Sequence, residues 1–287
     1  MRLLKRDRDH GGLSCIVLGG TGAGKTTFML SAVALPLLET REILFWRDSE
    51  FCQWTFLPLN RVKLLLSPFY EYEWIDKDTG ETVNVDDYVR NSYCYTLEDY
   101  YEKAEPNVLN VVYTDYAGWF NFISSVLLMR RDVRWVSLYM DEVEKFVPAN
   151  VEGNRWRMNL AFANALAEFR KNFISFYCAA QDYGDVDYRV TNKLNFKVYL
   201  RNARVPKAHS MVYPQVPRHL NMGEAVIEGM GEFTKHTFTK LQHQLNLLVR
   251  IKPLLAGNGL AESYAADAAM EELENEAGEA SVNAGAS

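Results

Sequence analysis

The sequence has few of the features that mark a secreted, membrane-embedded or metal-binding protein. No apolar run reaches the roughly 18 residues needed to span a bilayer, and the charged first ten residues lack the apolar stretch of a secretory signal. The four cysteines lie far apart, without a Cys-x-x-Cys pair, and the five histidines show no metal-ligand spacing. We therefore expect a reduced, soluble protein of the cytoplasm with no direct membrane span.

The chain also lacks an excess of positive charge, because 31 Lys and Arg face 37 Asp and Glu. Seven of those acids lie in residues 257–287, which contain no Lys or Arg, so their removal leaves 31 basic and 30 acidic residues. The overall acidity therefore does not exclude a nucleic-acid partner. Residues 256–287 are rich in Ala, Gly, Asn and Ser, and we expect an acidic, disordered C-terminal tail after a single domain over 1–255.

Short apolar runs alternate with helical patterns along the rest of the chain. Buried strands are predicted at 14–18, 42–46, 62–66, 108–114, 133–140, 173–180 and 196–200, helices at 25–35, 119–129 and 156–169, and a closing strand pair at 225–227 and 233–238. The helix at 25–35 should end near Pro36. This alternation predicts an α/β fold with a mostly parallel central sheet and helices on both faces. Residues 70–85 read as a hairpin around Asp78-Thr79-Gly80, within a predicted insertion over 68–105.

A glycine-rich segment lies between the first predicted strand and the first predicted helix. It reads Gly19-Gly20-Thr21-Gly22-Ala23-Gly24-Lys25-Thr26 and fits the pattern G-x-x-x-x-G-K-[ST]. Small residues let backbone N–H groups converge on phosphate oxygens, while a lysine neutralises the β- and γ-phosphates and a hydroxyl completes a Mg²⁺ shell. The alternative is a glycine turn with a surface lysine. The flanking strand and helix favour a site for ATP and Mg²⁺.

Polar residues follow two later strands, at the edge where such sheets bind ligands. Asp141 and Glu142 end the strand at 133–140, as a Walker B pair does, with Asp141 on Mg²⁺ and Glu142 as the proton acceptor for the attacking water. The alternative is a helix N-terminus, where acids are also favoured. Gln181 ends the strand at 173–180 and either contacts the γ-phosphate or water, or simply begins a loop.

Several of these segments together resemble the FtsK–HerA superfamily of DNA-pumping ATPases. The resemblance rests on the phosphate loop through Thr27, on Met140-Asp-Glu-Val-Glu-Lys-Phe-Val-Pro148 and on the segment Leu166–Gln181, with weaker similarity later. It implies a RecA-like fold and an arginine that acts on the neighbouring subunit's site. The matching residue is Arg170, 11 positions before Gln181, with Arg201 and Arg204 as alternatives.

Departures from the family pattern indicate which branch of the superfamily the chain resembles. No Pro follows Gln181, residues 67–105 have no counterpart in the family pattern, and no additional N-terminal domain is recognised. These features resemble the compact ATPases that package genomes into the capsids of internal-membrane icosahedral viruses. The resemblance implies DNA, a homo-oligomeric ring such as a hexamer, and capsid or vertex proteins as partners, in host cytoplasm or on the virion.

Other functions remain open on the sequence alone. A Zot-like filamentous-phage or conjugative DNA-transfer ATPase shares the core motifs but usually needs a membrane attachment. A small-molecule kinase also uses a phosphate loop, and a nucleotide-dependent scaffold would not need Glu142. Basic clusters at Lys5-Arg6-Arg8, at Arg130-Arg131-Arg134 and at Arg155-Trp156-Arg157 are candidate DNA contacts, the last preferred because it includes an aromatic residue, or are ordinary surface charge.

Overall fold

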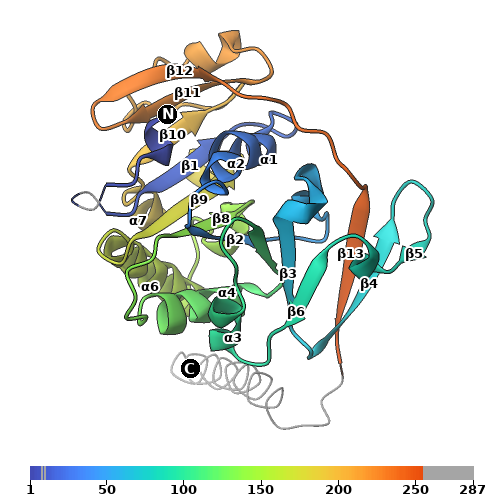
Figure 1. Ribbon diagram of the computed structural model, residues 1–287. Helices are drawn as coiled ribbons and strands as arrows, with labels where there is room; N and C mark the ends of the chain where they lie inside the picture. The colour runs from blue at the N-terminus through green and yellow to red at the C-terminus, as the bar shows by residue number, and fades with distance from the viewer. Residues whose placement is uncertain (8, 10, 255–287) are drawn as a thin grey trace, which may run out of the picture.

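A ten-stranded sheet organises the protein in a computed structural model that describes residues 1–7, 9 and 11–254 (Figure 1). The strand order is β12-β11-β10-β1-β9-β8-β2-β7-β3-β6. The strands are β1 (Ser14–Leu18), β2 (Ile43–Arg47), β3 (Val62–Leu66), β6 (Arg90–Tyr93), β7 (Leu109–Val112), β8 (Val136–Met140), β9 (Ile174–Ala180), β10 (Phe196–Tyr199), β11 (Glu224–Gly229) and β12 (Glu232–Thr237). All neighbours from β10 to β6 pair in parallel, and β11 and β12 pair antiparallel at one edge. The predicted α/β class is confirmed.

The centre of the sheet is formed by β1, β9 and β8. Every residue of these strands is buried, as expected of parallel strands covered on both faces. The register pairs Leu18 with Ala180 and Met140 with Cys178, so the three strands end close together. Residues that follow them in the chain therefore meet at one edge of the sheet, which we call the carboxyl edge. The opposite side, where the parallel strands begin, is the amino edge.

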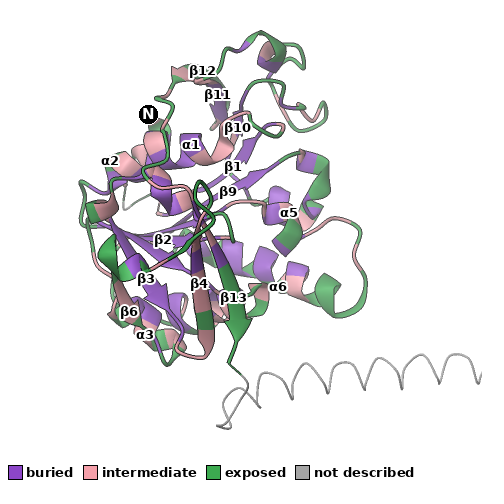
Figure 2. Cartoon of the chain, turned by 90° about the vertical axis from the view of Figure 1, so that its right-hand side faces the viewer, coloured by how far each residue is buried: buried purple, intermediate pink, exposed green. Residues whose placement is uncertain are grey.

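Helices cover both faces of the sheet. They are α1 (Lys25–Phe28), α2 (Leu35–Leu37), α3 (Leu97–Glu102), α4 (Tyr116–Asn121), α5 (Val143–Phe146), α6 (Gly153–Phe169) and α7 (Tyr188–Thr191). On one face Phe162 of α6 packs edge-on against Phe176 of β9, with ring centroids 5.4 Å apart. On the other face Phe28 of α1 belongs to the same apolar cluster as Tyr177. Figure 2 shows the resulting layers, with buried strands inside and exposed residues on the outer sides of the helices.

The first helical segment extends beyond its predicted end. It continues past Pro36 to Leu37, with a π-helical stretch from Met29 to Ala34 between α1 and α2. Proline lacks the N–H that an α-helix would direct at the fourth residue before it. The wider π turn changes the hydrogen-bond pattern just before Pro36, which allows the helix to continue. The helix predicted at 119–129 likewise starts earlier, at Tyr116, and also ends in a π-helical stretch.

Residues 70–83 and the last described residues build a second, smaller sheet. The predicted hairpin is present as β4 (Tyr70–Asp76) and β5 (Thr82–Val83), and β13 (Leu247–Pro253) pairs antiparallel with the whole of β4. Trp74 of β4 packs against Trp54 and Tyr113, which fixes this sheet to the main body. β6, by contrast, joins the main sheet beside β3.

The domain limits and the insertion proposed at 68–105 stay predictions. The predicted acidic tail, 256–287, lies outside the described residues. Within the described residues, no helix combines the length and apolar character that crossing a bilayer requires.

Candidate functional site

The phosphate loop connects the end of β1 to α1, as the motif predicts. Gly22 and Gly24 have φ angles of 75° and 91°, in the left-handed region where a side chain would be strained. The Lys25 ammonium folds back over the loop and donates to the carbonyl oxygens of Gly19 and Gly20, at 2.8 and 3.4 Å. A neutral carbonyl oxygen binds an ammonium more weakly than a charged phosphate oxygen does. Lys25 can therefore exchange these two partners for an anion.

Asp141 connects the phosphate loop to β8. The Thr26 hydroxyl donates to Asp141 Oδ2 at 2.6 Å, although the two residues are 115 positions apart. A hydroxyl and a carboxylate at this separation are the hard oxygen ligands that Mg²⁺ prefers, and Mg²⁺ usually takes one or two protein oxygens and completes its shell with phosphate and water. The residues present therefore fit a Mg²⁺–nucleotide complex.

Glu142 has an unusual backbone conformation. Its φ and ψ angles are 51° and 49°, a left-handed geometry that costs energy for a residue with a side chain and that is concentrated at functional sites. Its N–H donates to Asp141 Oδ1 at 2.9 Å, which holds the two acids in a fixed relation. The Glu142 carboxylate accepts from Lys145 Nζ at 2.7 Å, and both side chains are exposed.

Gln181 follows β9, between the phosphate loop and the acid pair. Its backbone N–H donates to Glu144 Oε1 at 3.4 Å. The sequence reasoning did not assign Glu144 a role. Its Oε2 is buried with no hydrogen-bond partner in the described part of the chain. Burial raises the pKa of Glu144, and the charges of Asp141 and Glu142 raise it further, whereas hydrogen bonds from backbone N–H groups oppose this rise. In the sequence, the position of Glu144 shortly after the predicted Walker B pair was the feature that could have indicated a role for it.

A pocket of about 440 Å³ opens beside the acid pair, between β8, β7, β2 and the small sheet. Its lining includes Asp141, Glu142, Arg47, Tyr116 and Tyr70. The Arg47 guanidinium lies 4.2 Å from the centre of the Tyr116 ring, and burial lowers its pKa. The acid pair is therefore accessible from outside on the side away from the phosphate loop.

Comparison with solved structures identifies the fold. No family model matches the sequence, and no curated protein matches it. The genome packaging NTPase B204 of Sulfolobus turreted icosahedral virus 2, solved with AMPPCP, is similar with a TM-score of 0.53 and 12% identity over 81% of this chain and 99% of its own. The plasmid coupling protein TrwB, solved with GDPNP, gives a TM-score of 0.55 and 12% identity, covering 82% of this chain and 88% of its own. At this identity the likeness shows the fold.

The chain has the fold of a P-loop NTPase. The predicted resemblance therefore holds at the level of the fold, which the chain shares with a genome packaging NTPase and with plasmid coupling proteins at low sequence identity.

Arg170 lies at the opposite edge of this NTPase fold. It follows α6 and precedes β9, whose seven residues separate it from Gln181 by roughly 23 Å at 3.3 Å per residue. The Gly12 N–H donates to the Arg170 carbonyl at 3.1 Å, and a Cβ on Gly12 would lie 1.8 Å from the Ile174 carbonyl oxygen. Arg170 is therefore anchored far from the phosphate site of its own chain. Arg204, in contrast, lies at the carboxyl edge, where it pairs with Asp182 at 3.0 Å.

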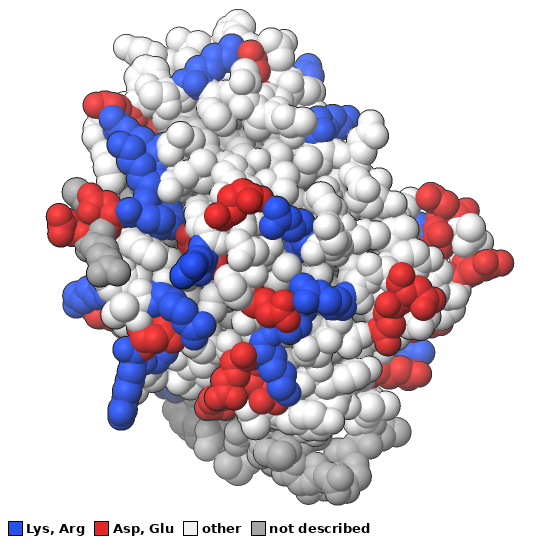
Figure 3. Space-filling view, viewed as in Figure 1, with Lys and Arg blue, Asp and Glu red and all other residues white. Residues whose placement is uncertain are grey.

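The three basic clusters differ in position. Arg155 to Arg157 begin α6 at the carboxyl edge and are exposed. Arg130 and Arg134 lie at the amino edge, before β8. Arg6 is buried in an ion pair with Glu42, which removes it from the candidate DNA contacts. In Figure 3 most Lys and Arg side chains lie toward the left and middle of the face, and acids predominate at the right edge, over the β4–β5 hairpin.

Proposed function

We propose that the protein is an ATP-driven DNA translocase, of the kind that packages a viral genome into a preformed capsid. The observation that carries the proposal is the Thr26–Asp141 hydrogen bond, which joins the phosphate loop to the acid pair with Gln181 on the strand between them. This arrangement suits hydrolysis of a nucleoside triphosphate. The likeness to a genome packaging NTPase supports the choice of substrate and task.

Each site residue has a task that follows from its position. Lys25 exchanges its two carbonyl partners for the β- and γ-phosphates. Thr26 and Asp141 hold Mg²⁺, which neutralises phosphate charge when it is bound. Glu142 accepts a proton from the attacking water after its carboxylate leaves Lys145, and Gln181 orients that water or the γ-phosphate.

A homo-oligomeric ring, with a hexamer as the first candidate, completes the proposed site. An arginine that stabilises the transition-state charge contributes on the order of 10³–10⁵ in rate. Because Arg170 lies at the amino edge, it reaches a phosphate site only on another subunit. Such an arrangement makes hydrolysis depend on the geometry between neighbours, as a motor requires. Capsid or vertex proteins are the further partners expected for packaging.

Steady-state ATP hydrolysis with and without duplex DNA tests the function. We expect wild-type turnover to rise with DNA, and Glu142→Gln to lower it about 10²–10⁴-fold while binding of a fluorescent ATP analogue persists. Glu168→Gln, a change of the same type in the exposed Lys171 ion pair, serves as the control and should have no effect. Turnover that ignores DNA but depends on a small phosphate acceptor would instead indicate a kinase. Unchanged turnover of Glu142→Gln would refute its assigned role.

A conjugative coupling ATPase is the second candidate, because TrwB is as similar in structure as B204. The two functions differ in their partners. Co-purification with capsid proteins during infection would favour packaging, whereas recovery with a membrane-bound conjugation complex would favour transfer.

A further inference from the structure

Two segments that leave the catalytic strands meet again on the carboxyl edge. One runs from Asp141 through α5 to residues 147–149, and the other from Gln181 to residues 185–187. They are joined by a bridge between Pro148 and Val186 and by two backbone hydrogen bonds of 2.9 and 3.0 Å. The first segment continues into α6, which carries Arg155, Trp156 and Arg157 near its start, and the second into α7, which carries Tyr188 and Arg189.

The junction holds three side chains together that we call the Trp156 platform: Trp156, Tyr188 and Arg189. The Arg189 guanidinium lies 4.6 Å from the Trp156 ring centre and 5.8 Å from that of Tyr188. Buried Asp187 fixes it, accepting from Arg189 Nε and from Asn159 Nδ2 at 2.9 Å each. The hydrogen bonds from the Arg189 side chain are the largest cause that lowers the pKa of Asp187 to about 2. Arg189 is therefore held in place beside the Trp156 ring.

The platform nevertheless leaves large aromatic rings exposed. Trp156 is 45% and Tyr188 71% exposed, and the neighbouring Arg155 and Arg157 are exposed as well. Because Asp187 neutralises Arg189, the platform offers ring faces more than charge. Rigid aromatic rings beside cations are the surface on which unpaired bases stack, since every base has a π face and a duplex hides it.

We propose that the Trp156 platform binds an unpaired nucleic-acid strand, with bases stacked on Trp156 and Tyr188 and phosphates on Arg155 and Arg157. The inference rests on the proposed DNA-translocase function and adds where and in which form the strand is held. The strand is then connected to Asp141 and Gln181 by two short segments fixed to each other. A change in the bound nucleotide and a change in the bound strand would therefore both act on these two joined segments.

Binding of a fluorescent oligothymidylate by the full chain tests this proposal. Trp156→Ala and Tyr188→Ala should each weaken binding roughly 5- to 150-fold, without changing the dependence on salt. Arg157→Ala should lower the slope of log affinity against log salt by about 0.7, the value for one phosphate of a single strand. Tyr188→Phe retains the ring and should bind as the wild type does.

Tyr95→Ala provides the matched control. Tyr95 is also exposed and has an ammonium, that of Lys103, 5.6 Å from its ring centre, but it follows the edge strand β6, five strands from β9. At about 4.8 Å per strand, β6 lies roughly 24 Å from β9, the strand from which one of the two segments of the junction leaves. Unchanged affinity in Trp156→Ala and Tyr188→Ala, or equal losses for a duplex of the same length, would overturn the proposal. DNA-stimulated ATP hydrolysis that persists in these variants would show that the proposed DNA-translocase function does not depend on the Trp156 platform.

Discussion

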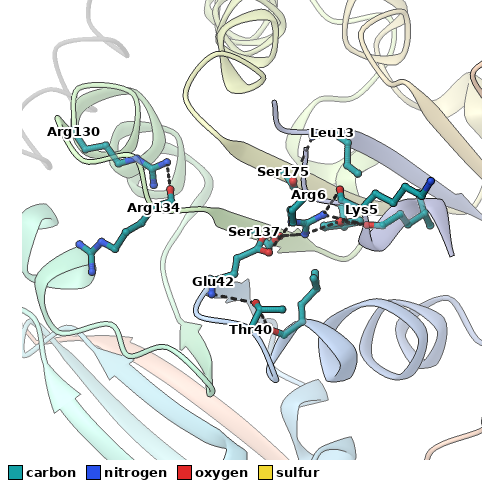
Figure 4. Close-up of polar contacts among 12 residues, drawn as sticks. Lys5, Arg6, Leu13, Thr40, Glu42, Arg130, Arg134, Ser137 and Ser175 are labelled. Atoms are coloured by element: carbon teal, nitrogen blue, oxygen red, sulfur yellow. Dashed lines mark hydrogen bonds and ion pairs between the residues drawn. The ribbon is translucent and has the colours of Figure 1, made fainter. Parts of the chain in front are cut away.

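Charged groups at the two edges of the central sheet have different surroundings. At the amino edge Arg6 makes a bidentate pair with Glu42, at 2.7 and 3.0 Å (Figure 4). Arg6 also donates to Ser137 and Tyr177. At the carboxyl edge Lys25 donates to two loop carbonyls and Glu142 pairs with an exposed lysine. The Arg6–Glu42 pair is thus shielded and held by several hydrogen bonds, whereas Lys25 and Glu142, the two residues proposed for chemistry, keep partners that are easily exchanged.

Among the residues of the amino edge, loss of Arg170 should have the largest effect. Arg170→Ala should lower ATP turnover on the order of 10³–10⁵-fold, because a neighbour's transition state loses its cation. Mixing this variant with Lys25→Ala should restore part of the turnover, since about a quarter of randomly formed interfaces combine an intact loop with an intact arginine. Lys171→Ala, the next residue, should be silent. Loss of turnover without rescue in mixtures would contradict action between subunits.

The next largest effect is expected from Arg6 and concerns stability alone. The side chains of Arg6 and Glu42 are only 13% and 2% exposed, so Arg6→Ala leaves a buried carboxylate without its partner. We expect the free energy of unfolding in urea to fall by about 3–5 kcal/mol. The double variant Arg6→Met, Glu42→Leu should recover much of this loss. Nucleotide affinity of the folded fraction should not change, and a change would show that the two edges are not separate in function.

Asp48 should make the carboxyl edge less stable at neutral pH. Burial raises its pKa from 3.8 to about 6, against opposing hydrogen bonds from Ser49, Trp46 and Tyr113. Between pH 4 and 6 the folded state therefore holds a proton that the unfolded state has lost, so stability falls as the pH rises through this window and then levels off. Urea titrations at pH 4.5 and 7.5 should show the contribution of Asp48 as a difference, because stability should fall more, or rise less, in the wild type than in Asp48→Asn. Burial lowers the pKa of His236 and His243, which changes stability in the opposite sense in both proteins. The same change in both proteins would exclude Asp48 as the source.

The smallest effect is expected at Lys145. Releasing the Glu142 carboxylate from an exposed ion pair costs little, so Lys145→Ala should raise ATP turnover only about 1.5- to 5-fold. Lys171→Ala removes a comparable pair with Glu168 at the amino edge and is the matched control. A decrease in turnover would indicate that Lys145 assists the reaction instead of restraining Glu142.

Most of the central sheet could be predicted from local sequence. β1 and β3 occupy the predicted residues because a buried parallel strand is a short, continuous apolar run. The Thr26–Asp141 contact also follows from the motifs and the strand order. These features depend on short segments whose residue types have few structural alternatives.

The remaining features depend on contacts between distant segments. β13 gave no signal because its partner β4 lies about 180 positions earlier, and the last four residues of β13 are exposed, two of them charged. Arg6 could not be distinguished from a surface cation without Glu42, and Tyr188 could not be linked to Trp156 before α6 and α7 were placed together. A side-chain role that depends on a partner distant in the sequence can be assigned only once the fold is known.

The close contact at Gly12 has a mechanical consequence for a ring. The Gly12 N–H donates a hydrogen bond to the Arg170 carbonyl. Two residues later the chain enters β1, which ends at the phosphate loop. β1 thus links the predicted phosphate site at one end to the backbone contact with Arg170 at the other. In the proposed ring, a tilt of β1 on nucleotide binding in one subunit would move the arginine that acts on the next subunit. Hydrolysis in one subunit would thereby prepare its neighbour for hydrolysis.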